Sequence, residues 1–425
     1  MTTTIGERIR HRRLLRGWSV RHAASRAGIS HATWSRIERG LQAADNRYVL
    51  ADIAAALECS PTDLAGVPVP AADLAAMAAQ AGVYALRQAL VDADLTEPAG
   101  PSDSAGPSDS ADLTQPAEFS QPADLTQPAD RPAPDVRRLQ RTTDLVDSLR
   151  SSCDYAGAAR VLPALLRDLH AAAGGPDRDV ALRLFCQATF MASGVVRNLG
   201  HPAEAWLAAE RCRDAAVASG DPILLGLAAH ARGSAATACG SFQRALALTA
   251  RAADELRPHS DAPGGLEMLG SLQLVCAYAS RGLKKIDQSR AFAEEAGRLA
   301  ARTGESPALS LFFGPTNVNI WRIGIEADGG DPGEAVHIAR DTNPAVIEAN
   351  CRQVFFYADA ARALAHLRNR DREAIRYLLT AERLAPQHVH SSPMSRETTR
   401  ALLERSRRSA GGTELRGLCE RMGVV

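Results

Sequence analysis

Residues 17–40 read GWSVRHAASRAGISHATWSRIERG, and this stretch decides the fold of the N-terminal part of the chain. Glycine follows each helical pattern in it, as is typical of helix ends, and Ser19 and Ser30 stand where helix N-caps are expected. The pattern predicts two short helices, 20–27 and 31–39, joined by a tight turn. Two helices joined in this way form a helix-turn-helix, a motif whose second helix enters the major groove of DNA.

Helical patterns on both sides complete a unit of five helices. Ile5, Ile9 and Leu14 share one face of a first helix, the apolar residues of 50–57 share a face of a fourth, and Pro61 begins a short fifth. We therefore expect an all-α domain at residues 1–70.

This unit resembles the λ-repressor-like, XRE-type DNA-binding domain. The resemblance rests on Arg13, Gly17–Ser19, Ala24, Ala27–Ser30 and Trp34–Gly40. It implies that Trp34 and Ile37 are core residues. It also implies that Arg13 and Glu38 form a buried pair that ties the third helix to the first; the other interpretation is that both charges are solvated.

The resemblance also implies which residues contact DNA. Base contacts are implied for His31, Ala32, Ser35 and Arg36. Phosphate contacts are implied for Arg21, Arg39, Asn46 and Arg47. The Arg36 guanidinium can offer two donors to guanine, whereas Ala32 can contact only a thymine methyl group. The family often has glutamine at the start of the second helix; this chain has Val20 there, and Arg21 is the candidate substitute.

Charge is distributed unevenly along the chain. The 425 residues carry 49 basic and 49 acidic side chains, so the net charge of zero excludes a chain that is basic throughout but not a local basic patch. Residues 1–47 nevertheless hold ten arginines and three acidic residues, a net charge of +7 that suits a DNA-binding domain. Residues 92–130 hold nine carboxylates and no basic residue.

The acidic segment is a hexapeptide array that includes GPSDSA twice and DLTQPA twice between residues 94 and 129. Its proline, serine and aspartate content prevents a packed core. We expect 92–134 to be a disordered linker, which serves either as a spacer or as an acidic tract for a partner. Residues 71–91 predict a connecting helix, which serves either for packing or for a dimer contact.

Residues 135–425 are predicted to form a helical solenoid. Small residues recur at intervals of 39–47 residues, just after a turn, at Ala158, Ala205, Ala245, Ser289, Ala335 and Ala374. The units at 230–258 and 357–386 resemble tetratricopeptide repeats, in which small residues let two antiparallel helices approach closely.

In arrays of this kind the first helix of each hairpin lines a concave groove. The side chains expected there are Gln187, Arg197, His230, Ser234, Tyr278, Arg281, Asn317, Asp359 and His366. As a set they suit a peptide backbone or another polar ligand, while each singly is also explained as a solvated polar residue. Asn317 and Asn319 follow Pro315 early in a helix, where they either clamp an extended peptide or satisfy the local backbone.

Other classes of protein find little support in the sequence. It contains no Walker loop, G-x-S-x-G, H-E-x-x-H or G-x-G-x-x-G motif, so we expect neither an enzyme nor a cofactor. The eight cysteines are scattered singly, which indicates reduced thiols rather than a metal site. We expect a cytoplasmic location without membrane insertion, because no secretory signal or uninterrupted apolar span is evident.

The whole plan resembles XRE-type regulators with C-terminal tetratricopeptide-like domains from high-GC Gram-positive bacteria, and is similar in plan to peptide-sensing quorum regulators. This resemblance implies a homodimeric transcriptional regulator that binds double-stranded operator DNA. Its repeat domain would sense a peptide, a small molecule or a protein partner. The alternative is an interaction scaffold whose helix-turn-helix has lost the salt-dependent DNA affinity of a regulator.

Overall fold

The computed structural model describes residues 4–66, 74–95, 135–406 and 413–424. These residues form helices, and the β-type pairing among them is limited to an isolated bridge between Ser306 and Phe313. The predicted all-α fold is therefore confirmed. The remainder of the predicted acidic linker, residues 96–134, lies outside the described residues.

The N-terminal domain consists of α1 (Ile5–Leu15), α2 (Val20–Arg26), α3 (His31–Glu38), α4 (Arg47–Ala56) and α5 (Pro61–Ala65). Each helix begins after a residue whose side-chain oxygen accepts a backbone N–H of the first turn: Thr4, Ser19, Ser30, Asn46 and Ser60. Ile9, Trp34, Ile53 and Leu64 are fully buried and form the centre of the core. The five predicted helices are present.

Helix α6 (Leu74–Asp92) packs along the first hairpin of the array, so it is more than a connection between domains. Gly82 makes the close approach possible, because a Cβ atom there would lie 2.6 Å from Cβ of Ala159. The ordered segment also extends beyond the predicted start of the linker at residue 92. Ala93 is buried, and Asp94 forms an ion pair of 2.9 Å with Arg211.

The C-terminal region stacks six helical hairpins. They are α7 (Val136–Ser151) with α8 (Tyr155–Ala172), α9 (Arg178–Asn198) with α10 (Pro202–Ser219), α11 (Pro222–Ala238) with α12 (Phe242–Leu256), α13 (Gly265–Gly282) with α14 (Ile286–Thr303), α15 (Pro315–Gly329) with α16 (Pro332–Arg340), and α17 (Asn350–Ala365) with α18 (Asp371–Leu384). Short 3-10 turns occupy Arg257–His259, Ala308–Ser310 and Pro344–Val346. The array ends with α19 (Pro386–Ser391), α20 (Pro393–Ser406) and α21 (Thr413–Met422).

The predicted small-residue register is present in this array. In every hairpin the fourth residue of the second helix is one of the six predicted positions, and all six are at most 3% exposed. A small side chain there lets the partner helix approach closely enough for direct hydrogen bonds. Ser193 Oγ donates to the Ala205 carbonyl at 2.9 Å, and Ser289 Oγ donates to the Ala277 carbonyl at 2.7 Å.

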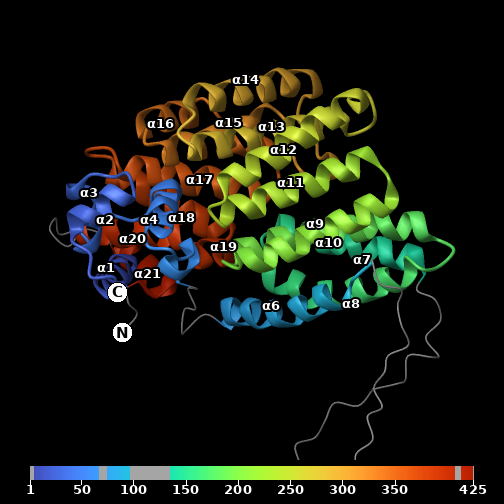
Figure 1. The fold of residues 1–425 in the computed structure, drawn as a ribbon, viewed down its shortest axis with the longest axis horizontal. Helices are drawn as coiled ribbons and strands as arrows, with labels where there is room; N and C mark the ends of the chain where they lie inside the picture. The colour runs from blue at the N-terminus through green and yellow to red at the C-terminus, as the bar shows by residue number, and fades with distance from the viewer. Residues whose placement is uncertain (1–3, 67–73, 96–134, 407–412, 425) are drawn as a thin grey trace, which may run out of the picture.

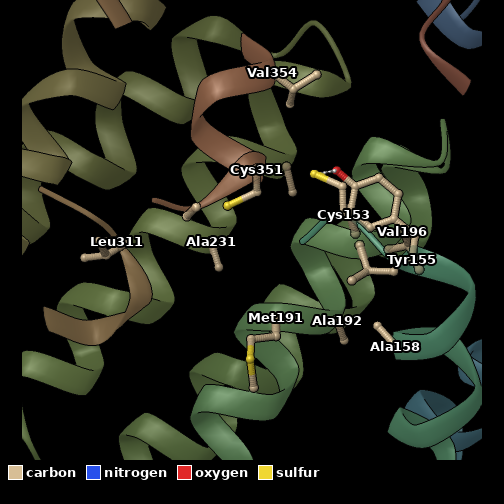
Figure 2. Packing of buried hydrophobic residues seen from close by; sticks show 14 of the residues in the cluster. Cys153, Tyr155, Ala158, Met191, Ala192, Val196, Ala231, Leu311, Cys351 and Val354 are labelled. Atoms are coloured by element: carbon tan, nitrogen blue, oxygen red, sulfur yellow. Dashed lines mark hydrogen bonds between the residues drawn. The ribbon is translucent and has the colours of Figure 1, made fainter. Parts of the chain in front are cut away.

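The core of the array is continuous from hairpin to hairpin. Figure 2 shows Tyr155, Met191, Ala231 and Val354 packed in it, from α8, α9, α11 and α17. The Tyr155 hydroxyl also hydrogen bonds Nδ1 of His388 on α19 at 2.8 Å. The array therefore curves until its first hairpin touches the helix that follows its last hairpin.

Helix α9 is long and apolar enough to cross a membrane by length and composition, which the sequence expectation did not include. However, 67% of its most apolar window is buried inside the structure. Its apolar side chains therefore form part of the array's core.

The N-terminal domain lies against the array rather than apart from it. Figure 1 shows its blue helices beside the red C-terminal helices, near α17, α18 and α20. Met394 of α20 joins the domain's own hydrophobic core. The position of this contact determines which predicted site residues meet.

Glycine positions in the array provide a test of the packing. A Cβ atom at Gly233 on α11 would lie 2.4 Å from Thr249 Cγ2. A Cβ atom at Gly297 on α14 would have no described atom within 4 Å apart from the helix's own backbone and the adjacent residues. We expect Gly233→Ala to destabilise the fold by about 1–3 kcal/mol through overpacking. Gly297→Ala should stabilise it by about 0.5–1 kcal/mol through helix propensity. Thermal melts followed by far-UV circular dichroism will show shifts of opposite sign; shifts of the same sign would contradict this packing.

Candidate nucleic-acid interface and its junction with the array

Helix α3 has a buried face and an exposed face. Trp34 and Ile37 are buried, and Trp34 Nε1 donates a hydrogen bond of 2.5 Å to Glu38 Oε1. The opposite face carries the four predicted base-contacting residues, of which His31, Ala32 and Arg36 are exposed and Ser35 is half-buried. The structure thus brings these four side chains to one surface of a helix that is firmly anchored to the domain.

Arg13 and Glu38 form the ion pair that ties α3 to α1. Arg13 Nε lies 2.6 Å from Glu38 Oε1 and Nη2 lies 2.8 Å from Oε2, with both side chains below 9% exposure. The remaining Nη1 donates to the Trp18 carbonyl at 2.7 Å. The hydrogen bonds with Glu38 raise the pKa of Arg13 above its usual value. A bidentate pair of this kind fixes both the distance and the orientation of the two helices.

The four predicted phosphate-contacting residues fall into two groups. Arg21 on α2 and Arg39 after α3 are exposed, and Arg39 Nε donates to the Ser35 carbonyl at 3.2 Å. Asn46 and Arg47, in contrast, face the helical array. Asn46 Oδ1 caps α4 through the Val49 N–H at 2.9 Å, while its Nδ2 donates to a carbonyl of the array at 2.7 Å.

Arg47 belongs to a buried charge cluster that joins the domain to the array. We call Arg47, Asp328, Asp359 and Arg362 the junction cluster. Arg47 Nη1 lies 2.7 Å from Asp328 Oδ2, and Nη2 lies 3.2 Å from Asp359 Oδ1. Arg362 Nη1 lies 2.6 Å from Asp328 Oδ1, and Nη2 lies 2.8 Å from Asp359 Oδ1. Two guanidinium groups thus neutralise two carboxylates that have almost no access to solvent.

The pKa shifts in the junction cluster follow from this pairing. Burial by itself would raise the pKa of Asp359, but the charges and hydrogen bonds of Arg47 and Arg362 outweigh it and hold the pKa below the usual value. Burial would lower the pKa of Arg362, but Asp328 and Asp359 outweigh it and raise the pKa. Asp359 and Arg362 are therefore charged near neutral pH, and a DNA phosphate cannot take Arg47 without separating it from this cluster.

A second contact lies at Asp45, which is buried. Its carboxylate hydrogen bonds Nε2 of His366 at 2.9 Å and accepts from Thr398 Oγ1 at 2.8 Å. Burial would raise the pKa of Asp45, but these two partners and the charge of Arg362 lower it. His366, predicted as a groove residue, thus binds the N-terminal domain.

Aromatic packing and an outer ion pair complete the junction. The Tyr48 ring lies 5.3 Å from the Phe242 ring and 5.1 Å from the Tyr278 ring, and the Tyr48 hydroxyl donates to the Tyr278 carbonyl at 2.9 Å. At the rim, Lys284 Nζ lies 3.1 Å from Asp52 Oδ2. The array therefore contacts α4 along much of its length.

A cavity of about 290 Å³ lies between α4, α5 and the array, and it adjoins a second cavity of about 80 Å³. Six of the predicted groove residues line one or both: Arg197, His230, Ser234, Tyr278, Asn317 and Asp359. The convergence of these side chains follows from the curvature of the array. α4 and α5 close one side, because Leu50 and Pro61 line the larger cavity.

The other groove residues lie elsewhere. Gln187 and Asn319 are half-buried and are not among the residues that line either cavity. Arg281 Nη2 forms an ion pair of 3.1 Å with Glu326 and donates to the Gly329 carbonyl.

Asn317, which lines the smaller cavity, is held by two hydrogen bonds. Its Nδ2 donates to the Leu311 carbonyl at 3.0 Å and its Oδ1 accepts from Arg352 Nε at 2.9 Å. Its amide is thus engaged by the local backbone and by a neighbouring side chain.

Sequence reasoning missed five residues of this region: Trp321, Asp328, Arg352, Phe355 and Arg362. A signal existed for one of them, since Arg362 interrupts the small apolar run 360–364 on a face that must be buried. A charge in such a position requires a buried partner. The identity of that partner could not be read from the local sequence.

The helix-turn-helix domain family matches residues 4–66, which are the five N-terminal helices. No curated protein and no solved structure matches the chain. The match therefore characterises the N-terminal domain and leaves the array to be interpreted from its geometry.

The Asp45–His366 contact predicts how stability changes with pH. The hydrogen bond with Asp45 raises the pKa of His366. The contribution of the Asp45–His366 contact to folding is therefore complete when the pH is below the unperturbed histidine pKa of about 6.5. This contribution is lost as the pH rises through the raised pKa of His366. Relative to His366→Gln, the wild type should be more stable at acidic pH by about 1 kcal/mol or less, because His366 is partly exposed.

Denaturant titrations across this pH range will measure that difference, which should vanish at alkaline pH. The matched control is His337→Gln at an exposed position on α16. A wild-type advantage that grows with rising pH would contradict the assignment.

Proposed function

We propose that this protein is a sequence-specific DNA-binding transcriptional regulator of the XRE type, whose tetratricopeptide-like array senses an effector. The observation that carries the proposal is the exposed face of α3, on a domain matched by the helix-turn-helix family. His31, Ala32, Ser35 and Arg36 read base edges from this face, and Arg21 and Arg39 contact phosphates.

The junction cluster links this reader to the array. Arg47 is a phosphate contact in the proposed complex with DNA, and its guanidinium is bound to Asp328 and Asp359 when the domain is docked. Docking and DNA binding therefore compete for the same charge. An effector that prefers one arrangement shifts the balance between them.

Cytoplasmic location and homodimerisation are parts of the same proposal. A homodimer is expected because paired helix-turn-helix domains read paired half-sites on DNA. On α6, Met77, Tyr84 and Val91 expose apolar side chains at seven-residue intervals, opposite the face that packs on α8. This face suits contact with a second copy of the chain. Sedimentation velocity of the wild-type chain tests this part, and a monomer would contradict it.

The base-reading assignment is tested by selection of binding sites from random double-stranded DNA. The wild type should enrich a defined site. Arg36→Ala should lose about 1–3 kcal/mol of discrimination at the guanine it contacts, while keeping non-specific affinity. The matched control Arg251→Ala, at an exposed arginine on α12, should select the wild-type site. If the wild type enriches no site, the interaction scaffold becomes the better interpretation.

The competition at the junction is tested with the two lysines. Lys284→Glu places a like charge beside Asp52 and should weaken docking, so that Asn46 and Arg47 become available to phosphates. We expect DNA affinity to rise a few-fold, in keeping with about 1 kcal/mol for an exposed pair, with a steeper salt dependence. The control Lys285→Glu makes the same charge change at the neighbouring exposed residue. Equal effects of the two substitutions on fluorescence-anisotropy titrations would contradict the competition.

A further inference from the structure

Arg197 and Arg352 line the larger cavity, and neither has a carboxylate of the described residues within ion-pair distance. Within the described residues, the Arg197 guanidinium makes neither a hydrogen bond nor an ion pair. Arg352 donates from Nε to Asn317 Oδ1 at 2.9 Å, and its guanidinium carbon lies 5.2 Å from the centre of the Phe355 ring. The two come from α9 and α17, and both also line the smaller cavity.

These two residues differ from the other arginines around the cavities. Arg47 is paired in the junction cluster, and Arg150, which lines the smaller cavity, lies 2.8 Å from Asp147. Burial, together with the positive charges of neighbouring arginines, lowers the pKa of Arg197 and lowers that of Arg352 to about 10. An uncompensated charge in such a place costs stability, so its presence points to an anion that compensates it.

Two polar atoms in the same place also have no partner. His230 Nδ1 and Ser234 Oγ are buried and make no hydrogen bond with any described residue. His230 is neutral, because burial and the charges of Arg197 and Arg352 lower its pKa to about 3. Ser234 lines both cavities and His230 lines the smaller one. A hydroxyl and a neutral imidazole can each donate to an anionic oxygen.

The remaining walls indicate what the anion is attached to. Trp321 and Phe355 line both cavities, and their rings flank Arg352. The volume of about 290 Å³ is close to the lower limit of pockets that take small organic ligands, about 300 Å³. Asp359 lines the cavity too, but its charge is balanced by Arg47 and Arg362. Such a pocket favours a compact anion with a flat apolar body over a cation.

We propose that the larger cavity, together with the smaller one that adjoins it, binds a small organic anion, in which a carboxylate or phosphate attached to a planar apolar group is held by Arg197 and Arg352 and by donors from Ser234 and His230. That this anion is the regulator's effector rests on the proposed function above, whereas the binding of the anion to the cavity does not. Because Arg47 and Leu50 of α4 form part of the wall, occupancy favours the docked arrangement.

The test uses the full chain without DNA, so that it does not depend on the DNA-binding proposal. Calorimetric titrations and thermal melts are performed with benzoate and with phenyl phosphate, which distinguish the two anionic groups. Benzamide and benzylamine are the neutral and cationic counterparts. We expect saturable binding and a raised melting temperature with at least one aromatic anion only. Absence of binding by both anions, or equal binding of the uncharged amide, would overturn the proposal.

Arg197→Met separates a ligand-binding role from a structural one. Removal of an uncompensated charge should raise the melting temperature of the ligand-free protein and should weaken binding of the aromatic anion at least about tenfold, as for a lost charge-assisted hydrogen bond. The matched control is Arg281→Met, since Arg281 is paired with Glu326 and lies outside both cavities. It should lower the melting temperature and leave the affinity unchanged. If Arg197→Met lowers the melting temperature with unaltered affinity, the proposal is wrong.

Discussion

Arg362 bridges Asp328 and Asp359, and the arrangement of the two parts depends on this interaction. Two buried carboxylates side by side repel each other, and one arginine cannot neutralise both. The second guanidinium comes from Arg47 of the N-terminal domain. The array is therefore electrostatically incomplete at this position without the docked domain, and this incompleteness places α4 where it lies.

The curvature of the array has a comparable consequence. Small residues at one position of every hairpin allow the helices to pack closely, and the accumulated curvature brings α8 to α19. Polar side chains from α9, α11, α15 and α17 thereby converge on one space instead of lining an open surface. The N-terminal domain closes that space, so the lining of the larger cavity comes from both parts of the chain.

Much of the local structure could be predicted from the sequence, because its causes are local. Ser19 and Ser30 cap α2 and α3 as expected, and glycine ends each of these helices. The small-residue register of the array was also predictable, since hairpin packing repeats the same steric requirement in every unit. The start of the linker was placed too early, because the contacts of Ala93 and Asp94 depend on α10 and its neighbours.

The sequence by itself determined the helices, their caps, the repeat register and the concentration of positive charge in the N-terminal domain. Only the tertiary structure decided which charges are compensated. Asn46 and Arg47 have the composition of phosphate contacts, yet they are bound to residues more than 280 positions away, and no local pattern encodes that distance. Arg281 and Arg197 stand on the first helices of the fourth and second hairpins, but among the described residues Arg281 has a carboxylate within reach and Arg197 does not. The energy of a buried charge depends on its surroundings in space, so sequence could identify the arginines but not what each of them does.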